Sequence, residues 1–261
     1  MAEDVPRGRF VWYELMTTDP QGAQAFYTQL IGWGTEDFPG EQPYTMWTND
    51  GTPLGGVMEL PEEARQQGAP SHWIPYVAVP DVDAAVAQAG GLGAKTYVPP
   101  TDIPGAGRFA VLGDPQGAIF AVYRSANEHG GHDDMAEIGE FSWHELATTD
   151  HAAAFDFYRQ LFGWHETDTM DMGEMGPYLM YGRVPGKPPL GGIFNKPPQM
   201  PGPAAWLLYV RVADVDQAVD AVKKLGGQIL NGPMEVPGGD RIVQCMDPQG
   251  AAFALHSTAA A

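Results

Sequence analysis

The stretch Phe10–Trp33, FVWYELMTTDPQGAQAFYTQLIGW, decides the fold of this chain because it occurs twice. Phe141–Trp164 reads FSWHELATTDHAAAFDFYRQLFGW, and 14 of the 24 aligned positions are identical. Further along, the Leu-Gly-Gly of 54–56 returns at 190–192, and the Asp-Pro-Gln-Gly of 114–117 returns at 247–250. Self-similarity at a fixed offset marks a duplicated structural unit. The chain is therefore built from two homologous halves.

Each half contains a second, fainter copy of one module. A short strand-like run ends at Asp19, and apolar residues then recur at the spacing of one helix face over 20–30. Asp19 suits the N-cap of that helix, and Pro20 suits its first position. The same arrangement begins at Asp81, Asp150 and Asp214, and strand-like runs follow each helix. The pattern predicts four modules, each with the order strand–helix–strand–strand–strand.

Composition limits the partners of the chain. Its 261 residues carry a net charge of −19, and 44% of them are hydrophobic, enough for sizeable cores. A strongly acidic surface repels phosphate backbones and anionic lipid, which argues against binding nucleic acid or a membrane. No signal peptide or apolar run of membrane-spanning length is visible, so a cytoplasmic protein is expected. Cys245 stands alone and is interpreted as a small buried hydrophobe.

The repeat also predicts the domain boundaries. Residues 1–125 are expected to form a first domain of two modules, and residues 140–261 a second. Residues 126–139, ANEHGGHDDMAEIG, show no apolar period and are interpreted as the linker.

The repeated motifs resemble those of a known superfamily. The D-x6-FY-x2-L-x-G-W stretches that end at Trp33 and Trp164, with the two D-P-x-G turns, are similar to the vicinal oxygen chelate proteins. That group includes glyoxalase I, bleomycin-resistance proteins and extradiol dioxygenases, and the chain looks most like a tandem two-domain, glyoxalase-like branch found in actinobacteria. The resemblance implies an α+β fold in which four βαβββ modules pair into two half-open, mixed-sheet barrels. The helices would pack outside, and the inner face would hold a substrate.

Strand alternation then selects the residues on that inner face, since successive side chains point to opposite sides. Tyr13 and His144 are expected to point the other way, under the helices. The side chains predicted to bind a ligand are Phe10, Trp12, Tyr76 and Tyr123 in one half and Phe141, Trp143, Tyr209 and His256 in the other.

The superfamily's metal ligands have no counterpart at the matching positions. The resemblance places these ligands at Trp12, Ile74 and Ala121, and at Trp143, Leu207 and Ala254. None of these side chains suits a divalent cation. No cofactor is therefore expected. The alternative is Zn, Ni, Mn or Fe held in one domain through a shifted register, which would use Glu14, His72 and Tyr123, or Glu145 and His256.

A carboxylate recurs two residues after each tryptophan, at Glu14 and Glu145. A carboxylate facing an apolar interior is costly unless it is paired. One interpretation is a catalytic general base with a pKa raised by burial. The other is a structural ion pair with Arg108 and Arg241, which occupy matching positions.

Three functions remain open from the sequence. The first is a bleomycin-resistance-like protein that binds a small aromatic or electrophilic metabolite without a metal. The second is a glyoxalase-like lyase, isomerase or oxygenase that uses Glu14 and Glu145 as base or a metal in one domain. The third is a non-catalytic interaction protein. The pattern indicates no Ser-His-Asp or Cys-His nucleophile, and the chain is expected to be a monomer or a homodimer.

Overall fold

The computed structural model describes residues 5–39, 44–127, 130–200 and 202–259. Within them, each module carries one helix followed by three strands, as the repeat predicts. The first module contains β1 (Phe10–Thr17), α1 (Pro20–Leu30), β2 (Gly34–Asp37), β3 (Thr45–Asn49) and β4 (Thr52–Glu59). The second contains β5 (His72–Ala78), α3 (Val82–Gly91), β6 (Lys95–Ile103), β7 (Gly107–Gly113) and β8 (Ile119–Ser125), and the short α2 (Glu62–Gln66) precedes it.

The second half repeats this order. Its third module contains β9 (Phe141–Thr148), α4 (His151–Phe162), β10 (His165–Asp171), the 3-10 turn η1 (Gly173–Met175), β11 (Pro177–Gly182) and β12 (Gly191–Asn195). The fourth contains β13 (Ala205–Arg211), α5 (Val215–Lys224), β14 (Gln228–Glu235), β15 (Arg241–Met246) and β16 (Ala252–Ser257).

The four capping aspartates predicted from the sequence are confirmed. Asp19 accepts the backbone N–H of Gly22, and the other three accept a backbone N–H at the start of α3, α4 and α5. These bonds satisfy amide groups that have no partner inside the helix. The caps therefore fix the point at which each chain segment turns from strand to helix.

The strands form two eight-stranded mixed sheets with identical topology. Their orders are β2-β3-β4-β1-β5-β8-β7-β6 and β10-β11-β12-β9-β13-β16-β15-β14. β1 pairs in parallel with β4, β5 with β8, β9 with β12, and β13 with β16. The pairs β2–β3, β3–β4, β6–β7 and β7–β8 and their counterparts in the second sheet are antiparallel. The α+β class and the modular architecture are confirmed, with open sheets and not closed barrels.

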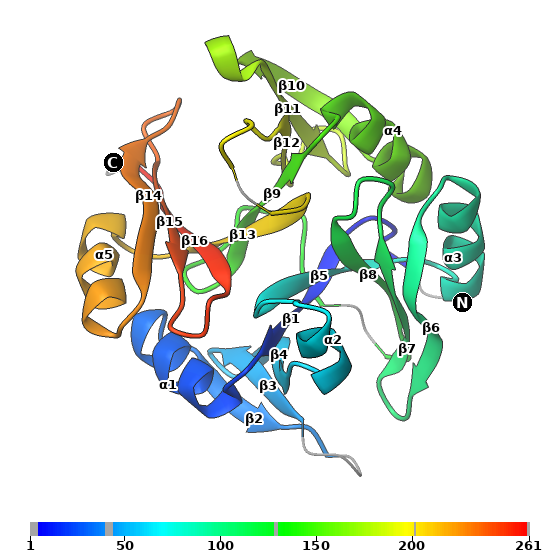
Figure 1. Cartoon of the computed structure of the whole chain (residues 1–261), viewed down its shortest axis with the longest axis horizontal. Helices are drawn as coiled ribbons and strands as arrows, with labels where there is room; N and C mark the ends of the chain where they lie inside the picture. The colour runs from blue at the N-terminus through cyan, green and yellow to red at the C-terminus, as the bar shows by residue number, and fades with distance from the viewer. Residues whose placement is uncertain (1–4, 40–43, 128–129, 201, 260–261) are drawn as a thin grey trace. The chain divides into compact units, whose positions relative to one another are not determined.

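The chain folds into two compact units, and these do not coincide with its two repeated halves. Unit 1 holds the described residues of Met1–Trp12, Ile74–Asp134 and His144–Trp206. Unit 2 holds those of Tyr13–Trp73, Met135–Trp143 and Leu207–Ala261. Each unit thus combines a module from each half, with α3 beside α4 in unit 1 and α1 beside α5 in unit 2 (Figure 1). The domain limits at residues 125 and 140 stay a prediction, and residues 128–129 of the expected linker lie outside the described part.

The repeated motifs meet inside each unit. In unit 1 the Tyr158 hydroxyl donates to Asp114 Oδ2 at 3.0 Å, and in unit 2 the Tyr27 hydroxyl donates to Asp247 Oδ2 at 3.0 Å. Both tyrosines and both aspartates are buried. The tyrosine of the FY motif in one half therefore binds the aspartate of the D-P-x-G turn in the other half.

The tryptophan that closes each repeated stretch makes a second link of this kind. Trp164 Nε1 donates to the Gly8 carbonyl at 2.8 Å in unit 1, and Trp33 Nε1 donates to the Gly139 carbonyl at 2.7 Å in unit 2. Each glycine lies two residues before the first strand of a half. An indole N–H needs such a partner when it is buried, so these bonds hold the strand entrances in place.

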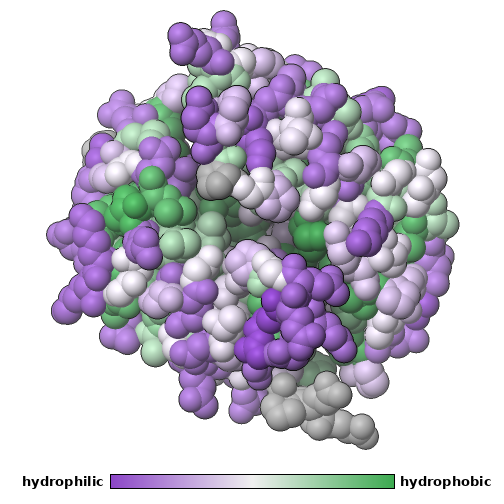
Figure 2. Space-filling view, in the orientation of Figure 1, coloured by the Kyte–Doolittle hydropathy of each residue, from purple (hydrophilic) through white to green (hydrophobic). Residues whose placement is uncertain are grey.

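Hydrophilic side chains cover most of the face shown in Figure 2, and apolar ones lie in separate patches. Large exposed apolar residues include Tyr97 on β6 and Leu230 on β14. Among the described residues, no helix has the length and apolar character needed to cross a membrane.

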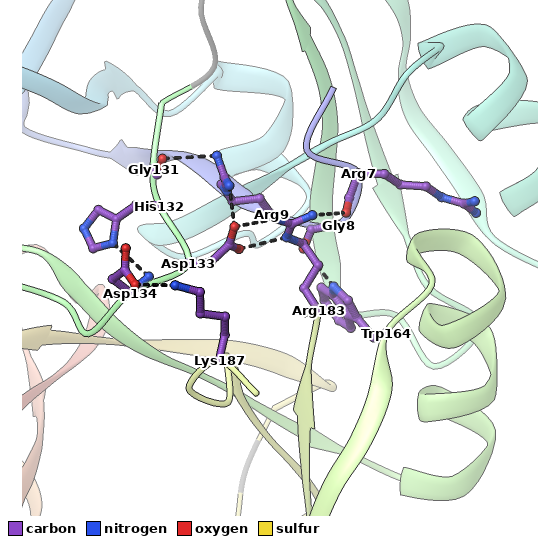
Figure 3. Close-up of polar contacts among 10 residues, drawn as sticks. All are labelled: Arg7, Gly8, Arg9, Gly131, His132, Asp133, Asp134, Trp164, Arg183 and Lys187. Carbon is purple, nitrogen blue, oxygen red and sulfur yellow. Dashed lines mark hydrogen bonds and ion pairs between the residues drawn. The ribbon is translucent and has the colours of Figure 1, made fainter. Parts of the chain in front are cut away.

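Part of the predicted linker is bound to unit 1 by ion pairs. Asp133 lies between Arg9, which precedes β1, and Arg183, which follows β11, and it pairs with both (Figure 3). Arg183 Nε reaches Asp133 Oδ1 at 2.8 Å, and Lys187 Nζ reaches Asp134 Oδ1 at 2.6 Å. Burial opposes the charge of Asp133, but the hydrogen bonds from Arg183 and Arg9 outweigh it and lower its pKa to about 2.

We expect Asp133→Asn to lower the free energy of unfolding at pH 7 by about 2 kcal/mol. A depressed carboxyl pKa stabilises the folded state above the unfolded value of 3.8, and this contribution is lost as the pH falls toward 2. Urea unfolding at pH 7 and pH 3 measures the difference between variant and wild type. Asp134→Asn is the control, because its side chain is 73% exposed and little change is expected. Equal losses in both variants would contradict the prediction.

Candidate functional site

In unit 2, Glu14 of β1 lies beside a tyrosine. The carboxylate is 4% exposed, and the Tyr44 hydroxyl donates to its Oε2 at 2.6 Å. Gly56 of β4 is the strand partner of Glu14, and a Cβ at this position would lie 1.9 Å from the Tyr44 hydroxyl. The glycine of the Leu-Gly-Gly motif is therefore required for the tyrosine to reach the carboxylate.

The same arrangement recurs in unit 1. The Tyr178 hydroxyl donates to Glu145 Oε2 at 3.0 Å, and Gly192 of β12 is the strand partner of Glu145. A Cβ at Gly192 would lie 2.1 Å from the Tyr178 ring. A phenol that donates to a carboxylate favours the ionised form and fixes its orientation. Both halves thus hold an oriented carboxylate, which suits binding of a hydrogen-bond donor or removal of a proton.

The structure rules out the arginine partners considered for these carboxylates. Arg108 donates to Asp83 and Asp102, and Arg241 donates to Asp216. These three acidic side chains are all more than half exposed. The expectation of a structural pair with Glu14 or Glu145 is wrong for both arginines, because each one pairs with acidic residues at the surface instead.

Sequence reasoning missed Tyr44 and Tyr178. The repeat carried a signal for them, since a tyrosine precedes the Leu-Gly-Gly motif in each half. The number of residues between this tyrosine and the Leu-Gly-Gly motif differs between the halves, however, because the connection between β11 and β12 is longer than the one between β3 and β4. A comparison at constant offset therefore did not align them.

Two predicted ligand-binding tyrosines lie together in unit 1. The Tyr76 ring is 6.0 Å from Phe109 and 6.3 Å from Tyr123, measured between centroids. Tyr123 donates to the Ala106 carbonyl at 2.7 Å, and burial raises the pKa of its hydroxyl. In unit 2, Tyr209 occupies the position equivalent to Tyr76 and accepts Gln244 Nε2 at 2.9 Å. The residues around Tyr76 offer aromatic rings, whereas the contact of Tyr209 is polar.

The other predicted aromatic positions have different surroundings. Phe10 is 4% exposed and stacks on His144 at 3.7 Å, and Phe141 stacks on Tyr13 at the same distance. Their partners are the residues predicted to lie under the helices, and both partners are buried. Trp12 and Trp143 are half-buried. A ligand-binding role stays a prediction for all four aromatic residues.

The side chains at the family's ligand positions do not fit a metal ion. Within each unit, indole, branched alkyl and methyl groups supply no oxygen or imidazole donor. In the described part of the chain, no group of three His, Cys, Asp or Glu side chains could hold an ion. The shifted-register residues have other contacts: Glu14 accepts Tyr44, His72 Nδ1 lies 2.8 Å from the Pro70 carbonyl, and His256 lies between Ser142 and Asp240.

The last of these contacts is one that sequence reasoning did not find. Ser142, His256 and Asp240 come from three separate segments of unit 2 and form a continuous hydrogen-bonded set. The repeat could not reveal it, because Val11, Tyr123 and Gly107 stand at the equivalent positions in the first half.

Comparisons with known proteins agree with this architecture. Residues 140–255 match the Glyoxalase/Bleomycin resistance protein/Dioxygenase superfamily, and residues 12–123 match the glyoxalase-like domain. The chain is 34% identical to "Putative glyoxylase CFP32" of Mycobacterium tuberculosis, over 94% of this chain and 92% of that protein. It is 32% identical to "Anthracycline biosynthesis protein DnrV" of Streptomyces peucetius, over 95% and 92%.

A solved structure shows the same fold at lower identity. The Mn(II)-bound glyoxalase from Novosphingobium aromaticivorans superposes with a TM-score of 0.62 and 20% identity, covering 97% of this chain and 82% of that one. Two repeated halves, each matching one glyoxalase-like domain and each built from paired βαβββ modules, lead to one conclusion. The chain belongs to the glyoxalase/bleomycin resistance protein/dioxygenase superfamily, as a protein with two glyoxalase-like domains.

Proposed function

We propose that this protein binds a small, planar aromatic metabolite and uses Glu14 and Glu145 as its polar anchors. One observation carries the proposal: both halves orient a carboxylate with a tyrosine hydroxyl and keep a glycine opposite it. Duplicated arrangements of polar groups are costly to maintain in an apolar interior and are typical of binding sites. The ligand must then present a hydroxyl or amino donor to the carboxylate.

The aromatic part of such a ligand would contact rings of the same unit as the carboxylate. In unit 1, which holds Glu145, Tyr76, Phe109 and Tyr123 form one such group, and the half-buried Trp12 is a further candidate. In unit 2, which holds Glu14, the candidate is the half-buried Trp143. Aromatic rings bind one another by stacking and edge contacts. The relative from Streptomyces peucetius is named for anthracycline biosynthesis, and anthracyclines are polycyclic aromatic compounds with hydroxyl groups. We therefore place the ligand among hydroxylated polycyclic aromatics.

Fluorescence titration with an anthracycline such as doxorubicin tests the proposal, and thermal shift supplies a second readout. We expect Glu14→Gln and Glu145→Gln each to weaken binding at their own site by about 10- to 100-fold. Loss of a hydrogen bond to a charged group costs about 1.5–3 kcal/mol. Tyr44→Phe and Tyr178→Phe should weaken binding less, because the carboxylate remains.

Lys95→Ala is a control at an exposed residue of β6 that should not change binding. If the double variant Glu14→Gln/Glu145→Gln binds doxorubicin as tightly as the wild type, the carboxylates are not the anchors. If the wild type shows neither a fluorescence change nor a shift in melting temperature with doxorubicin and other hydroxylated polycyclic aromatics, the proposed ligand class is wrong.

A second candidate function is glyoxalase-like lyase or isomerase chemistry, and the orientation of the carboxylates favours it. A carboxylate fixed by a phenol can act as a general base toward a carbon acid. Turnover of methylglyoxal with a thiol, together with metal analysis of untagged protein, tests this candidate. Turnover that survives in Glu14→Gln/Glu145→Gln would exclude these carboxylates as the base.

A further inference from the structure

Unit 2 contains a serine, a histidine and an aspartate in hydrogen-bonded sequence. Ser142 lies at the start of β9, Asp240 directly precedes β15, and His256 lies near the end of β16. Ser142 Oγ is 3.0 Å from His256 Nδ1, and His256 Nε2 is 3.0 Å from Asp240 Oδ2. A nucleophile within reach of a base, and a third group that orients the base, is the arrangement that activates a hydroxyl.

The aspartate decides which nitrogen of His256 carries the proton. Burial opposes the charge of Asp240, but the bonds from His256 and the Ala259 backbone N–H leave its pKa below the ordinary value. An ionised carboxylate only accepts hydrogen bonds, so Nε2 must donate to it. In the neutral imidazole, Nδ1 then presents its lone pair to the Ser142 hydroxyl, for which the Tyr209 carbonyl at 3.4 Å is a second, longer acceptor. In that tautomer Nδ1 can act as a general base toward Ser142.

The set is partly open to solvent. The side chain of His256 is 14% exposed and that of Asp240 is 35% exposed, whereas Ser142 is half-buried. Arg211, the strand partner of His256, adds a positive charge close to Asp240. A small reagent can therefore reach the edge of the set, and Arg211 supports the ionised form of Asp240.

The fold does not need these polar residues. In the first half the equivalent positions hold Val11, Ala78, Gly107 and Tyr123 in place of Ser142, Arg211, Asp240 and His256. Tyr123 there simply donates to the Ala106 carbonyl at 2.7 Å. The same strands and turns thus form without the set, so its residues were not imposed by the architecture.

We propose that Ser142 is a nucleophile that accepts acyl groups from activated esters and thioesters, with His256 as its general base and Asp240 as the group that orients the base. Ser142 Oγ bonds to the acyl carbon while its proton moves to His256 Nδ1. The bond to the alkoxide or thiolate breaks, and the leaving group takes the proton from His256. Water, deprotonated by the same imidazole, then releases the carboxylic acid and restores Ser142.

The test labels the protein with a fluorophosphonate probe and uses hydrolysis of the activated ester p-nitrophenyl acetate as a second readout. In labelling, Ser142 Oγ bonds to phosphorus, fluoride leaves, and His256 takes the hydroxyl proton. We expect one adduct per chain by intact-protein mass spectrometry and its location on Ser142 by peptide mapping. Ser142→Ala should abolish the adduct, and His256→Gln should slow labelling by about 100-fold or more, the usual share of a general base. Asp240→Asn should slow it by about 10-fold or more.

Ser125→Ala is the matched control, since it removes the hydroxyl that ends β8 in the first half, and labelling should be unchanged. A structural role, tying the end of the chain through Ala259 to Asp240, would move the melting temperature but would leave no adduct. The proposal is overturned if the folded wild type shows no adduct on Ser142, or if His256→Gln is labelled at the wild-type rate. The outcome is independent of the Glu14 and Glu145 variants, which should keep the wild-type labelling rate.

Discussion

Asp114→Ala should lower the free energy of unfolding of unit 1 by about 3–5 kcal/mol, because it removes at once the three hydrogen bonds that a buried carboxylate accepts. Asp114 Oδ1 accepts the backbone N–H groups of Gln116 and Ala118, each at 2.9 Å, and Oδ2 accepts the Tyr158 hydroxyl at 3.0 Å. Alanine leaves these donors without an acceptor, and the Ala118 N–H and the Tyr158 hydroxyl are buried. Urea unfolding followed by tryptophan fluorescence measures the loss.

Two variants separate the parts of this effect. Burial raises the pKa of Asp114, so the neutral Asp114→Asn keeps an acceptor for the turn, relieves the buried charge and should cost clearly less than alanine. Tyr158→Phe should cost about 1–2 kcal/mol, and a double-mutant cycle with Asp114→Ala gives the coupling between the two side chains.

Asp247→Ala should have a matching effect in unit 2, where the aspartate accepts a hydrogen bond from the Tyr27 hydroxyl. A loss below about 1 kcal/mol for Asp114→Ala would refute this account of the motif.

Lowering the pH from 7 to 4 should remove about 3 kcal/mol of stability from unit 1 through His144 alone. Burial lowers the pKa of this histidine to about 4, even though its ring lies 2.8 Å from the Leu190 carbonyl, which acts in the opposite direction. The unfolded chain titrates near 6.5, so it binds the proton first. The contribution is therefore complete above pH 6.5 and is lost as the pH falls toward 4.

The repeat supplies a matched variant for this prediction. Tyr13 occupies the equivalent position and stacks on Phe141 at 3.7 Å, as His144 stacks on Phe10. His144→Tyr should remove this part of the pH dependence, and the reverse change Tyr13→His should introduce it in unit 2. Urea midpoints at half-unit steps between pH 7 and pH 4 give the slopes. Identical slopes for wild type and His144→Tyr would show that protonation of His144 does not limit stability.

Local sequence predicted the modules well, for reasons that the structure makes clear. Asp19 and its three counterparts cap their helices because the interaction involves only neighbouring residues. The face that each strand residue occupies stays a prediction, because Glu14, Tyr13 and His144 are all buried and burial does not separate the two faces. The limits of the two domains rest on the repeat and remain a prediction.

The sequence predicted only part of the candidate site. Glu14 and Glu145 follow from the repeat, but their partners Tyr44 and Tyr178 do not align in it, because the β3–β4 and β11–β12 connections differ in length. The arginines at matching positions were the wrong partners, because they pair with exposed aspartates instead. Ser142, Asp240 and His256 have no repeated pattern at all and meet only because three strand ends of unit 2 converge.

The sequence by itself determined the superfamily, the four modules and the absence of the usual metal-ligand residues at the family's positions, since all three depend on residue identity and local spacing. Only the tertiary structure decided that the motif residues of one half bind those of the other half. Tyr158 binds Asp114 in unit 1, and Tyr27 binds Asp247 in unit 2. It also decided which tyrosine reaches each carboxylate and which serine lies beside His256. The physical reason is that a hydrogen bond between buried side chains depends on distance in space. Residues dozens to hundreds of positions apart acquire that proximity only when the sheets and helices pack.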